Sequence, residues 1–364
     1  MVFMQYSIIV PVYNRPDEVD ELLDSLTRQA YTDFEVLIVE DGSATPCRTV
    51  CDKYAGRLNL KYFFKDNSGP GQSRNYGAQR AQGEYIIILD SDVVVPDGYL
   101  RAIDEELKAS PCDAFGGADA SHPSFTPVQK AISYSMTSFF TTGGIRGGKA
   151  GGKSSAKQGN TTGAALDKFY PRSYNMGIRR TVYHQLGGFS KMRFGEDIDF
   201  SYRIVEAGYS SRLFPEAWVW HKRRTDLKKF FRQVYNSGIA RINLEKRHPG
   251  TMKIVHLLPM LFTVGVIALV LISAVGRALM YWNSENFWLW YWVCLTPWLP
   301  ILLYSGMIFA DSSLQHKSPK IGTLSVAAAF VQLMGYGFGF LEAWWKRCVR
   351  GKDEFQAFEK TFYK

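Results

Sequence analysis

The sequence has 364 residues, a formal net charge of +9 at pH 7 and 46% hydrophobic residues. This length excludes a small scaffold without a core, and it is enough for one large domain or two ordinary ones. Five cysteines without framework spacing argue against a disulfide-rich protein and indicate free thiols in a reducing compartment. The first residues have neither the basic nor the long apolar region of a cleavable signal peptide, so we expect the first domain to stay in the cytosol.

The first quarter of the chain has the pattern of an α/β sheet. Short apolar runs predict strands at 7–12, 34–39, 58–64 and 85–89, and helices are expected at 17–30, with Asp17 as a cap, at 46–54 and at 72–82. A strand, a helix and a strand at this spacing form a βαβ unit, which makes the sheet parallel. Polar residues follow the first, second and fourth strands at Tyr13, at Glu40-Asp41 and at Asp90-Ser91-Asp92.

Two acids one residue apart stand at the end of the fourth strand. In an open α/β sheet, ligands bind outside the carboxyl ends of the strands, so Asp90 and Asp92 are suited to hold a metal ion and a diphosphate. On their own, these acids are more simply explained as an Asp-rich turn, and the rest of the chain has to decide. Upstream, a loop at 67–71 opens a helix with Arg74 in its first turn, which suits phosphate binding or an ordinary helix cap.

Four segments, taken in order, carry a family resemblance. The segments SIIVPVYNRP, DFEVLIVEDGS and NSGPGQSRNYGAQRAQGEYIIILDSD resemble the nucleotide-binding half of the family-two glycosyltransferases with the GT-A fold. Further on, GGFSKMRFGEDIDFSYRIVEAGY is similar to the acceptor-side motif of that family, and the resemblance covers about residues 7–236. It implies a Rossmann-like, mostly parallel sheet and an enzyme that transfers a sugar from a nucleotide-diphosphate donor, with Mg²⁺ or Mn²⁺ and with inversion.

The resemblance also implies roles for particular residues. It assigns nucleotide-sugar binding to Pro11, Tyr13, Asp41, Arg74, Asp90, Ser91 and Asp92, with Asp92 as the direct metal ligand. His221 stands where some relatives supply a third metal ligand, although a histidine beside aromatic residues is as often a packed one. Glu40 departs from the family pattern, which often has a second Asp there.

The chemistry of sugar transfer requires similar residue types. A divalent ion stabilises the departing diphosphate, and a base takes the proton of the acceptor hydroxyl. Asp197 is the candidate base, with Glu196 and Asp199 as alternatives. All three acids are also explained as ordinary first-turn residues of a helix expected at 197–207.

The sequence contains a misleading pattern between Gly147 and Ser154, GGKAGGKS, which satisfies the phosphate-binding loop motif of ATPases. It lies within 143–163, a segment with eight glycines and four Lys or Arg, and neither a strand nor a helix flanks it. We interpret the match as a coincidence. The segment is expected to be a mobile basic loop that closes over the active site or touches an anionic acceptor.

The last part of the chain is expected to meet a membrane. Ten Lys or Arg between 222 and 253, against two acids, form a basic cluster, and residues 226–247 predict an amphipathic helix either at the membrane surface or packed on the catalytic domain. Three apolar segments follow at 254–275, 287–310, which Pro297 and Pro300 should kink, and 321–341, where a glycine run indicates close helix packing. Three crossings would put the basic tail outside, against the positive-inside rule, so one segment could instead be re-entrant or interfacial.

We therefore predict an α/β GT-A catalytic domain at 1–225, a basic interface helix at 226–253, a transmembrane region of about three helices at 254–341 and a basic tail at 342–364. The expected protein is a multi-pass enzyme of the cytoplasmic membrane with a cytosolic catalytic domain. Its expected partners are a nucleotide-sugar donor, a lipid-linked or glycan acceptor and membrane lipids. Nucleic acid is not expected, because no nucleic-acid-binding motif accompanies the positive charge. A processive polysaccharide synthase and a catalytically silent membrane scaffold are the alternatives.

Overall fold

The computed structural model describes residues 4–120, 122, 124–142, 169–222, 224–282 and 284–359. These residues form two compact units. The first comprises the described residues of 4–122 and 169–222 together with 358–359, and the second comprises 124–142 and 224–357. The Gly/Lys-rich segment 143–163 lies outside the described residues, so its expected role stays a prediction.

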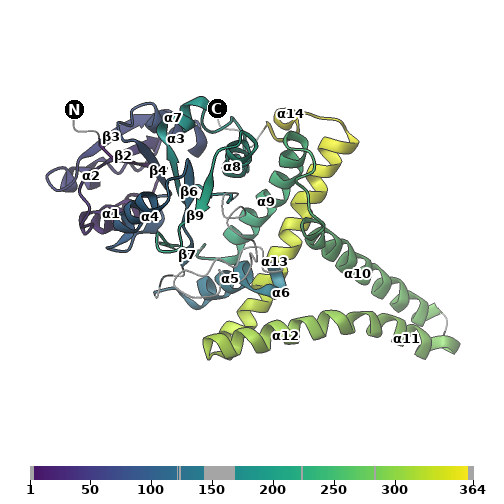
Figure 1. Ribbon diagram of the computed structural model, residues 1–364. Helices are drawn as coiled ribbons and strands as arrows, with labels where there is room; N and C mark the ends of the chain where they lie inside the picture. Colours follow the sequence, from purple (N-terminus) through teal and green to yellow (C-terminus); the bar gives the residue numbers. More distant parts are fainter. Residues whose placement is uncertain are drawn as a thin grey trace. The chain divides into compact units, whose positions relative to one another are not determined.

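The first unit is built on a seven-stranded sheet of order β3-β2-β1-β4-β8-β6-β9 (Figure 1). Its strands are β1 (Tyr6–Val12), β2 (Phe34–Asp41), β3 (Leu60–Lys65), β4 (Tyr85–Leu89), β6 (Ala114–Gly116), β8 (Asn175–Arg179) and β9 (Ser211–Leu213). The first four strands are mutually parallel, whereas β8 runs antiparallel to both of its neighbours. The mostly parallel sheet confirms the predicted α/β class.

A second, three-stranded sheet has the order β5-β10-β7. It consists of β5 (Val93–Val94), β7 (Asp119–Ala120) and β10 (Val219–His221). The helices of this unit are α1 (Pro16–Thr27), α2 (Arg48–Tyr54), α3 (Pro70–Ala78), α4 (Tyr99–Ala109), α7 (Arg180–Gln185) and α8 (Glu196–Glu206). The expected capping role of Asp17 is wrong: α1 begins one residue earlier, at Pro16, whose ring suits the first helical position, and Arg15 is the residue that precedes it.

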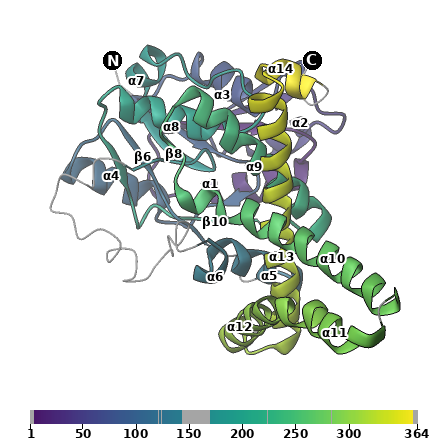
Figure 2. The same ribbon diagram turned by 90° about the vertical axis from the view of Figure 1, so that its right-hand side faces the viewer.

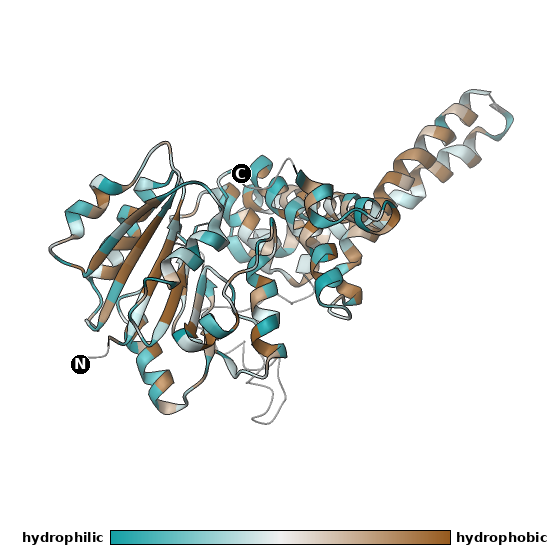
Figure 3. Cartoon of the chain, turned by 90° about the horizontal axis from the view of Figure 1, so that it is seen from above, coloured by the Kyte–Doolittle hydropathy of each residue, from teal (hydrophilic) through white to brown (hydrophobic). Residues whose placement is uncertain are grey.

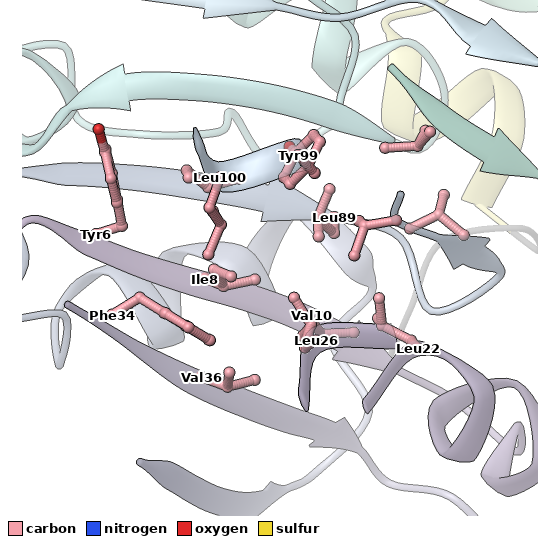
Figure 4. Packing of buried hydrophobic residues seen from close by; sticks show 14 of the residues in the cluster. Tyr6, Ile8, Val10, Leu22, Leu26, Phe34, Val36, Leu89, Tyr99 and Leu100 are labelled. Atoms are coloured by element: carbon pink, nitrogen blue, oxygen red, sulfur yellow. The ribbon is translucent and has the colours of Figure 1, made fainter. Parts of the chain in front are cut away.

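The central strands β1, β2 and β4 are buried on both faces, which explains their apolar runs. On one face, Ile8 and Val10 of β1 pack with Leu22 and Leu26 of α1 (Figure 4). On the other face, Ile9 of β1 belongs to a cluster that includes residues of α3, α7 and α8. Figure 3 shows the hydrophobic strands between helices that are polar outside. This packing holds the carboxyl ends of β1, β2 and β4 along one edge.

The second unit is helical. It contains α5 (Pro127–Thr137), α6 (Phe139–Thr142), α9 (Leu227–Arg247), α10 (Leu258–Trp282), α11 (Phe287–Leu295), α12 (Leu299–His316), α13 (Pro319–Trp344) and most of α14 (Glu354–Phe358). Among the described residues, three helical segments are long and apolar enough to cross a membrane: Ile254–Trp282, Phe287–His316 and Pro319–Val349. The segment 124–142 groups with these helices although parts of the first unit flank it in the sequence.

Two local predictions in the apolar region are confirmed. A short 3-10 turn, Thr296–Trp298, contains Pro297 and separates α11 from α12, whose first turn contains Pro300. The glycine run of α13 packs closely on its neighbours: a Cβ at Gly335 would lie 2.6 Å from Val234 Cγ2 of α9, and one at Gly337 would lie 2.0 Å from Thr263 Oγ1 of α10. Figure 2 shows α9 beside α13.

Candidate active site

The carboxyl end of β4 delivers two acids to one place. Asp90 follows the last residue of β4, and Asp92 directly precedes β5. Together with His221 they offer one ligand atom each, and these three atoms lie within 4.8 Å of one another. Asp92 is buried, with 7% of its surface exposed, and Ser91 between the two acids is buried as well. Two carboxylates and an imidazole form a donor set that suits Mn²⁺ and related divalent ions, so these residues fit the expected metal.

The small sheet brings His221 next to these acids, although His221 lies 129 positions after Asp92 in the sequence. In the antiparallel pairing of β10 with β5, His221 stands opposite Val93, and the backbone N–H of Lys222 donates to the carbonyl of Asp92 over 3.0 Å. The Nε2 atom of His221 lies 3.3 Å from Asp92 Oδ1. Strand pairing therefore puts this histidine in the site.

Two further residues orient the imidazole of His221, and sequence reasoning did not find either. Its Nδ1 atom lies 3.7 Å from a carboxylate oxygen of Asp119, on the neighbouring strand β7. The ring of Tyr174 stacks on the imidazole at a centroid distance of 5.0 Å. His221 is thus both a packed histidine and a candidate ligand. No sequence signal marks Asp119, because a single acid outside a motif has many ordinary explanations.

A third residue missed from the sequence is Arg15, which follows Tyr13 and Asn14 in the first motif. Its Nη1 atom lies 3.4 Å from Asp92 Oδ2. Its position in the loop after β1 could have indicated this contact, because β1 and β4 are parallel neighbours and end at the same edge of the sheet. Arg15 therefore places a positive charge beside the candidate metal ligands, where a diphosphate would need it.

Arg74 links the two acidic parts of the site. This residue is 3% exposed, and its guanidinium donates from Nη2 to Asp90 Oδ1 over 2.7 Å and from Nη1 to Glu196 Oε1 over 3.3 Å. The guanidinium also lies over the ring of Phe189, 5.2 Å from the ring centre. Burial lowers the pKa of Arg74, but the carboxylates of Asp90 and Glu196 outweigh burial and raise it. Arg74 is thus a permanent charge that holds two carboxylates in place.

The candidate base lies in the first turn of α8, which starts after Gly195 in a left-handed conformation with φ of 84°. Burial raises the pKa of Glu196, and the neighbouring Asp197 adds to this effect, whereas Arg74 opposes it. Asp197 Oδ2 lies 3.3 Å from Arg172 Nη1. A buried acid with a raised pKa, as at Glu196, is typical of functional sites.

Asp199, the remaining acid of this turn, has a structural environment. It is 2% exposed, accepts a hydrogen bond from Ser190 Oγ over 2.7 Å and pairs with Arg203 one turn later. These bonds tie α8 to the loop that precedes it. Asp199 is therefore less suited to proton transfer than Asp197 or Glu196.

Three of the residues expected to bind the nucleotide sugar lie at the ends of β1 and β2. Tyr13 is 53% exposed just beyond β1, and Pro11 lies within that strand. Asp41 is buried and accepts backbone N–H groups of Ser68 and Gly69 over 2.9 and 2.8 Å, and Lys65 pairs with it. Asp41 thereby anchors the loop that opens α3.

Glu40, the departure from the family pattern, is fully buried and accepts the backbone N–H of Cys47 over 2.8 Å. Its side chain holds the start of α2 to the end of β2. In this chain, the position therefore has a structural task of its own.

A pocket opens beside the acidic helix start. It is lined by residues 68–72 at the start of α3, by residues 190–193 and by Glu196. The backbone N–H groups of a helix start and the side chains of Lys191 and Arg193 favour an anionic group here.

Carboxylates gathered at the carboxyl end of a parallel sheet, beside the N-terminus of a helix, lie where open α/β folds such as GT-A bind their ligands. The chain belongs to glycosyl transferase family 2. The family model described as "Glycosyl transferase family 2" matches residues 7–159, and the one described as "Glycosyl transferase family group 2" matches residues 85–304.

Curated relatives match part of the chain. TarS of Staphylococcus aureus, a poly(ribitol-phosphate) beta-N-acetylglucosaminyltransferase, is 40% identical over 93 residues, which are 24% of this chain and 16% of TarS. EpsJ of Bacillus subtilis, an uncharacterized glycosyltransferase, is 33% identical over 111 residues, 30% of this chain and 32% of EpsJ. The match thus spans less than a third of either relative.

Among solved structures, the mannosyltransferase PcManGT of Pyrobaculum calidifontis, in complex with GDP-Man and Mn²⁺, resembles the chain with a TM-score of 0.54. The similarity covers 94% of this chain and 88% of that one at 14% identity, which supports the likeness of the fold.

Proposed function

We propose that this protein is a glycosyltransferase that is anchored in the cytoplasmic membrane and transfers a sugar, with inversion, from a nucleotide-diphosphate donor to a lipid-linked or glycan acceptor. The observation that supports this proposal most is the group formed by Asp90, Asp92 and His221. Arg74 connects this group to α8, the helix that bears the candidate base. One side of this arrangement suits the diphosphate and the other suits the acceptor. A single-displacement reaction requires both.

Asp92 and His221, with Asp90 beside them, would hold Mg²⁺ or Mn²⁺. The bound ion would stabilise negative charge on the departing nucleotide diphosphate. Arg15 adds positive charge next to Asp92, so the chain's own residues also favour a diphosphate here. The complex of PcManGT with GDP-Man and Mn²⁺, a protein of similar fold, supports this assignment.

Asp197 would accept the proton of the acceptor hydroxyl. Its carboxylate belongs to the first turn of α8, next to Glu196, which lines the pocket between residues 68–72 and 190–193. Glu196 is held by the buried Arg74, whereas Asp197 pairs with Arg172, whose side chain is 36% exposed, so Asp197 is the less constrained of the two acids. Proton removal by a positioned carboxylate contributes about 10²- to 10⁴-fold to a rate.

The anchoring is supported by the exposure of the apolar helices. In the most apolar stretch of Ile254–Trp282, and in that of Phe287–His316, only 6% of the residues are buried. These helices therefore present large apolar surfaces, whose contact with water is unfavourable. The name of TarS supports an anionic polymer as one acceptor class.

The test is a thermal-shift screen of nucleotide sugars, each with and without Mn²⁺, on the purified full chain in detergent. We expect one nucleotide sugar to raise the unfolding temperature only with the metal, and that donor should then be hydrolysed slowly without an acceptor. If the protein binds and hydrolyses none of the nucleotide sugars, the proposal is overturned and the alternative of a catalytically silent scaffold is supported. Release of long chains bound to the enzyme would indicate the processive alternative.

A further inference from the structure

Two of the three apolar segments have the surroundings of membrane-crossing helices, and the third does not. We propose that α10 and the α11–α12 segment cross the membrane as a hairpin, while α13 stays on the cytosolic side between α5 and α9. This inference rests on the membrane anchoring in the proposed function. It puts both ends of the apolar region on the same side.

The first argument is the environment of α13. In its most apolar window 44% of the residues are buried, compared with 6% in each of the other two segments. A Cβ at Gly339 would lie 2.0 Å from the carbonyl oxygen of Tyr235 in α9, so the two backbones touch. Further back, Ala328 of α13 shares a buried cluster with Ile132 of α5 and Phe230 of α9. Protein therefore covers a large part of α13, where lipid would cover a crossing helix.

The second argument is the charge on α9. This helix runs alongside α13 in the same direction, because Phe231 lies near Gly335 and Arg247 lies 3.2 Å from Glu354, beyond the end of α13. Its cations are distributed along its length: Lys228, Lys229 and Arg232, then Arg241, then Lys246 and Arg247. A charged side chain in the middle of a bilayer costs about 3 kcal/mol or more. Placing α9 and α13 together in the hydrocarbon would bring such charges with them.

The third argument is the chain path through α5. This helix is flanked in sequence by parts of the first unit, and the segment after it, residues 143–163, is too rich in Gly and Lys to cross a bilayer. Tyr134 of α5 donates a hydrogen bond of 2.5 Å to Asp311 near the end of α12. It also packs with Ala329 of α13. The end of α12 and the first half of α13 therefore lie on the same side of the membrane as α5.

The other end of α13 lies on that side too. The ion pair of Arg247 with Glu354 joins the end of α9 to the segment after α13, and Lys346 donates to the carbonyl of Ala357. With both ends of α13 on one side, the basic residues Lys346, Arg347, Arg350 and Lys352 are cytosolic. The positive-inside rule is then satisfied, and the conflict that three crossings create disappears.

The hairpin itself is held by contacts of α10 with α11 and the turn that follows. A Cβ at Gly276 would lie 2.4 Å from Cys294 Sγ, and Trp298 Nε1 donates to Ser273 Oγ over 2.9 Å. Figure 1 shows α10 leaving α13 and α11 and α12 returning to it. Exposed Tyr281, Trp282 and Trp288 gather near the tip, as expected where a hairpin reaches the far membrane surface. The acyl chains of the bilayer are the partner that suits its apolar sides.

The test is thiol labelling from each side of the membrane. Cys348, just beyond α13, is exposed, whereas Cys47, Cys51 and Cys112 are buried. Sealed vesicles of both orientations are treated with a membrane-impermeant maleimide. A Glu285→Cys substitution at the hairpin tip, made in a Cys348→Ser chain, provides the second probe, and the Cys348→Ser chain alone is the control for background labelling.

We expect Cys348 to be labelled only in inside-out vesicles and the cysteine of Glu285→Cys only in right-side-out vesicles. Labelling of Cys348 in right-side-out vesicles would mean that α13 crosses, which overturns this inference and leaves the membrane anchoring intact. If the tip cysteine is labelled only from the cytosolic side and alkaline carbonate releases the protein, the anchoring itself is wrong. The two failures are thus distinguishable.

Discussion

The guanidinium of Arg74 donates a hydrogen bond of 2.7 Å to the carboxylate of Asp90 at the carboxyl end of β4. Its second terminal nitrogen reaches Glu196, so one buried cation connects the candidate metal ligands to the helix that bears the candidate base. Since Arg74 is buried, its charge depends on these two acids for compensation.

Replacing Arg74 by Lys keeps the charge but removes the planar fork that reaches both carboxylates. We expect the Arg74→Lys enzyme to lose about 10-fold or more in kcat/KM, because Asp90 and Glu196 are then held separately. Steady-state kinetics measures this change. Arg101→Lys is the matched control, because Arg101 is an exposed arginine that pairs with Glu105 on its own helix. Equal activity of the two variants would show that the bridge has no functional role.

Asp92→Asn should abolish tight binding of Mn²⁺, because the substitution removes a charged ligand. Asp119→Asn should weaken binding less, by about 10- to 100-fold, since Asp119 acts through His221. Binding of the metal alone is followed by the electron paramagnetic resonance of free Mn²⁺. Asp97→Asn, at an exposed acid paired with Arg28, is the control and should bind Mn²⁺ as the parent does. If the Asp92→Asn variant binds Mn²⁺ as tightly as the parent does, the metal site lies elsewhere.

Asp197→Asn should lower kcat by about 10²- to 10⁴-fold while the affinity for the donor stays the same, because the carboxylate is needed only for proton removal. Turnover and nucleotide-sugar affinity are measured separately on the same preparation. Glu206→Gln, at an exposed acid of the same helix, should behave as the parent. A full loss in Glu196→Gln with an active Asp197→Asn would instead assign the base to Glu196.

The raised pKa of Glu196 predicts a pH dependence of stability. Between the ordinary pKa of 4.5 and the raised pKa, the native state holds a proton on Glu196 that the unfolded state has lost. The free energy of unfolding therefore falls as the pH rises through this range. Glu196→Gln resembles the protonated form and should therefore gain in unfolding temperature, relative to the parent, from pH 5 to pH 8. A difference between the two proteins that stays constant over this range would contradict the assignment.

Close packing of α9 on α13 predicts the effect of one added methyl group. Gly339→Ala would place its Cβ 2.0 Å from the carbonyl oxygen of Tyr235, a backbone atom that cannot move alone, so we expect a loss of about 1 to 3 kcal/mol in stability. Gly265→Ala, in α10, meets no atom within 4 Å and should leave the stability nearly unchanged. Unfolding of both variants in detergent is compared with the parent.

Much of the catalytic unit could be predicted from the sequence because its signals are local. The run of Tyr85 to Leu89 is buried in β4, and the acids that follow it stand at the carboxyl end of the strand. The helix that begins at Glu196 was expected to begin one residue later, at Asp197. Alternation and run length indicate such elements directly, since a strand buried on both faces leaves no polar position within it.

The sequence by itself determined the mostly parallel sheet, the position of Asp90 and Asp92 after a strand and of Asp197 at a helix start, and the presence of three apolar helices, because each depends on residues close together in the chain. The tertiary structure alone decided that Arg74 joins Asp90 to Glu196 and that Asp119 reaches His221. It also decided which apolar helix is covered by protein: α13 has the length and hydropathy of a crossing helix, but α9 packs along it. Hydropathy measures what a helix could bury, whereas only packing determines whether protein or another medium buries it.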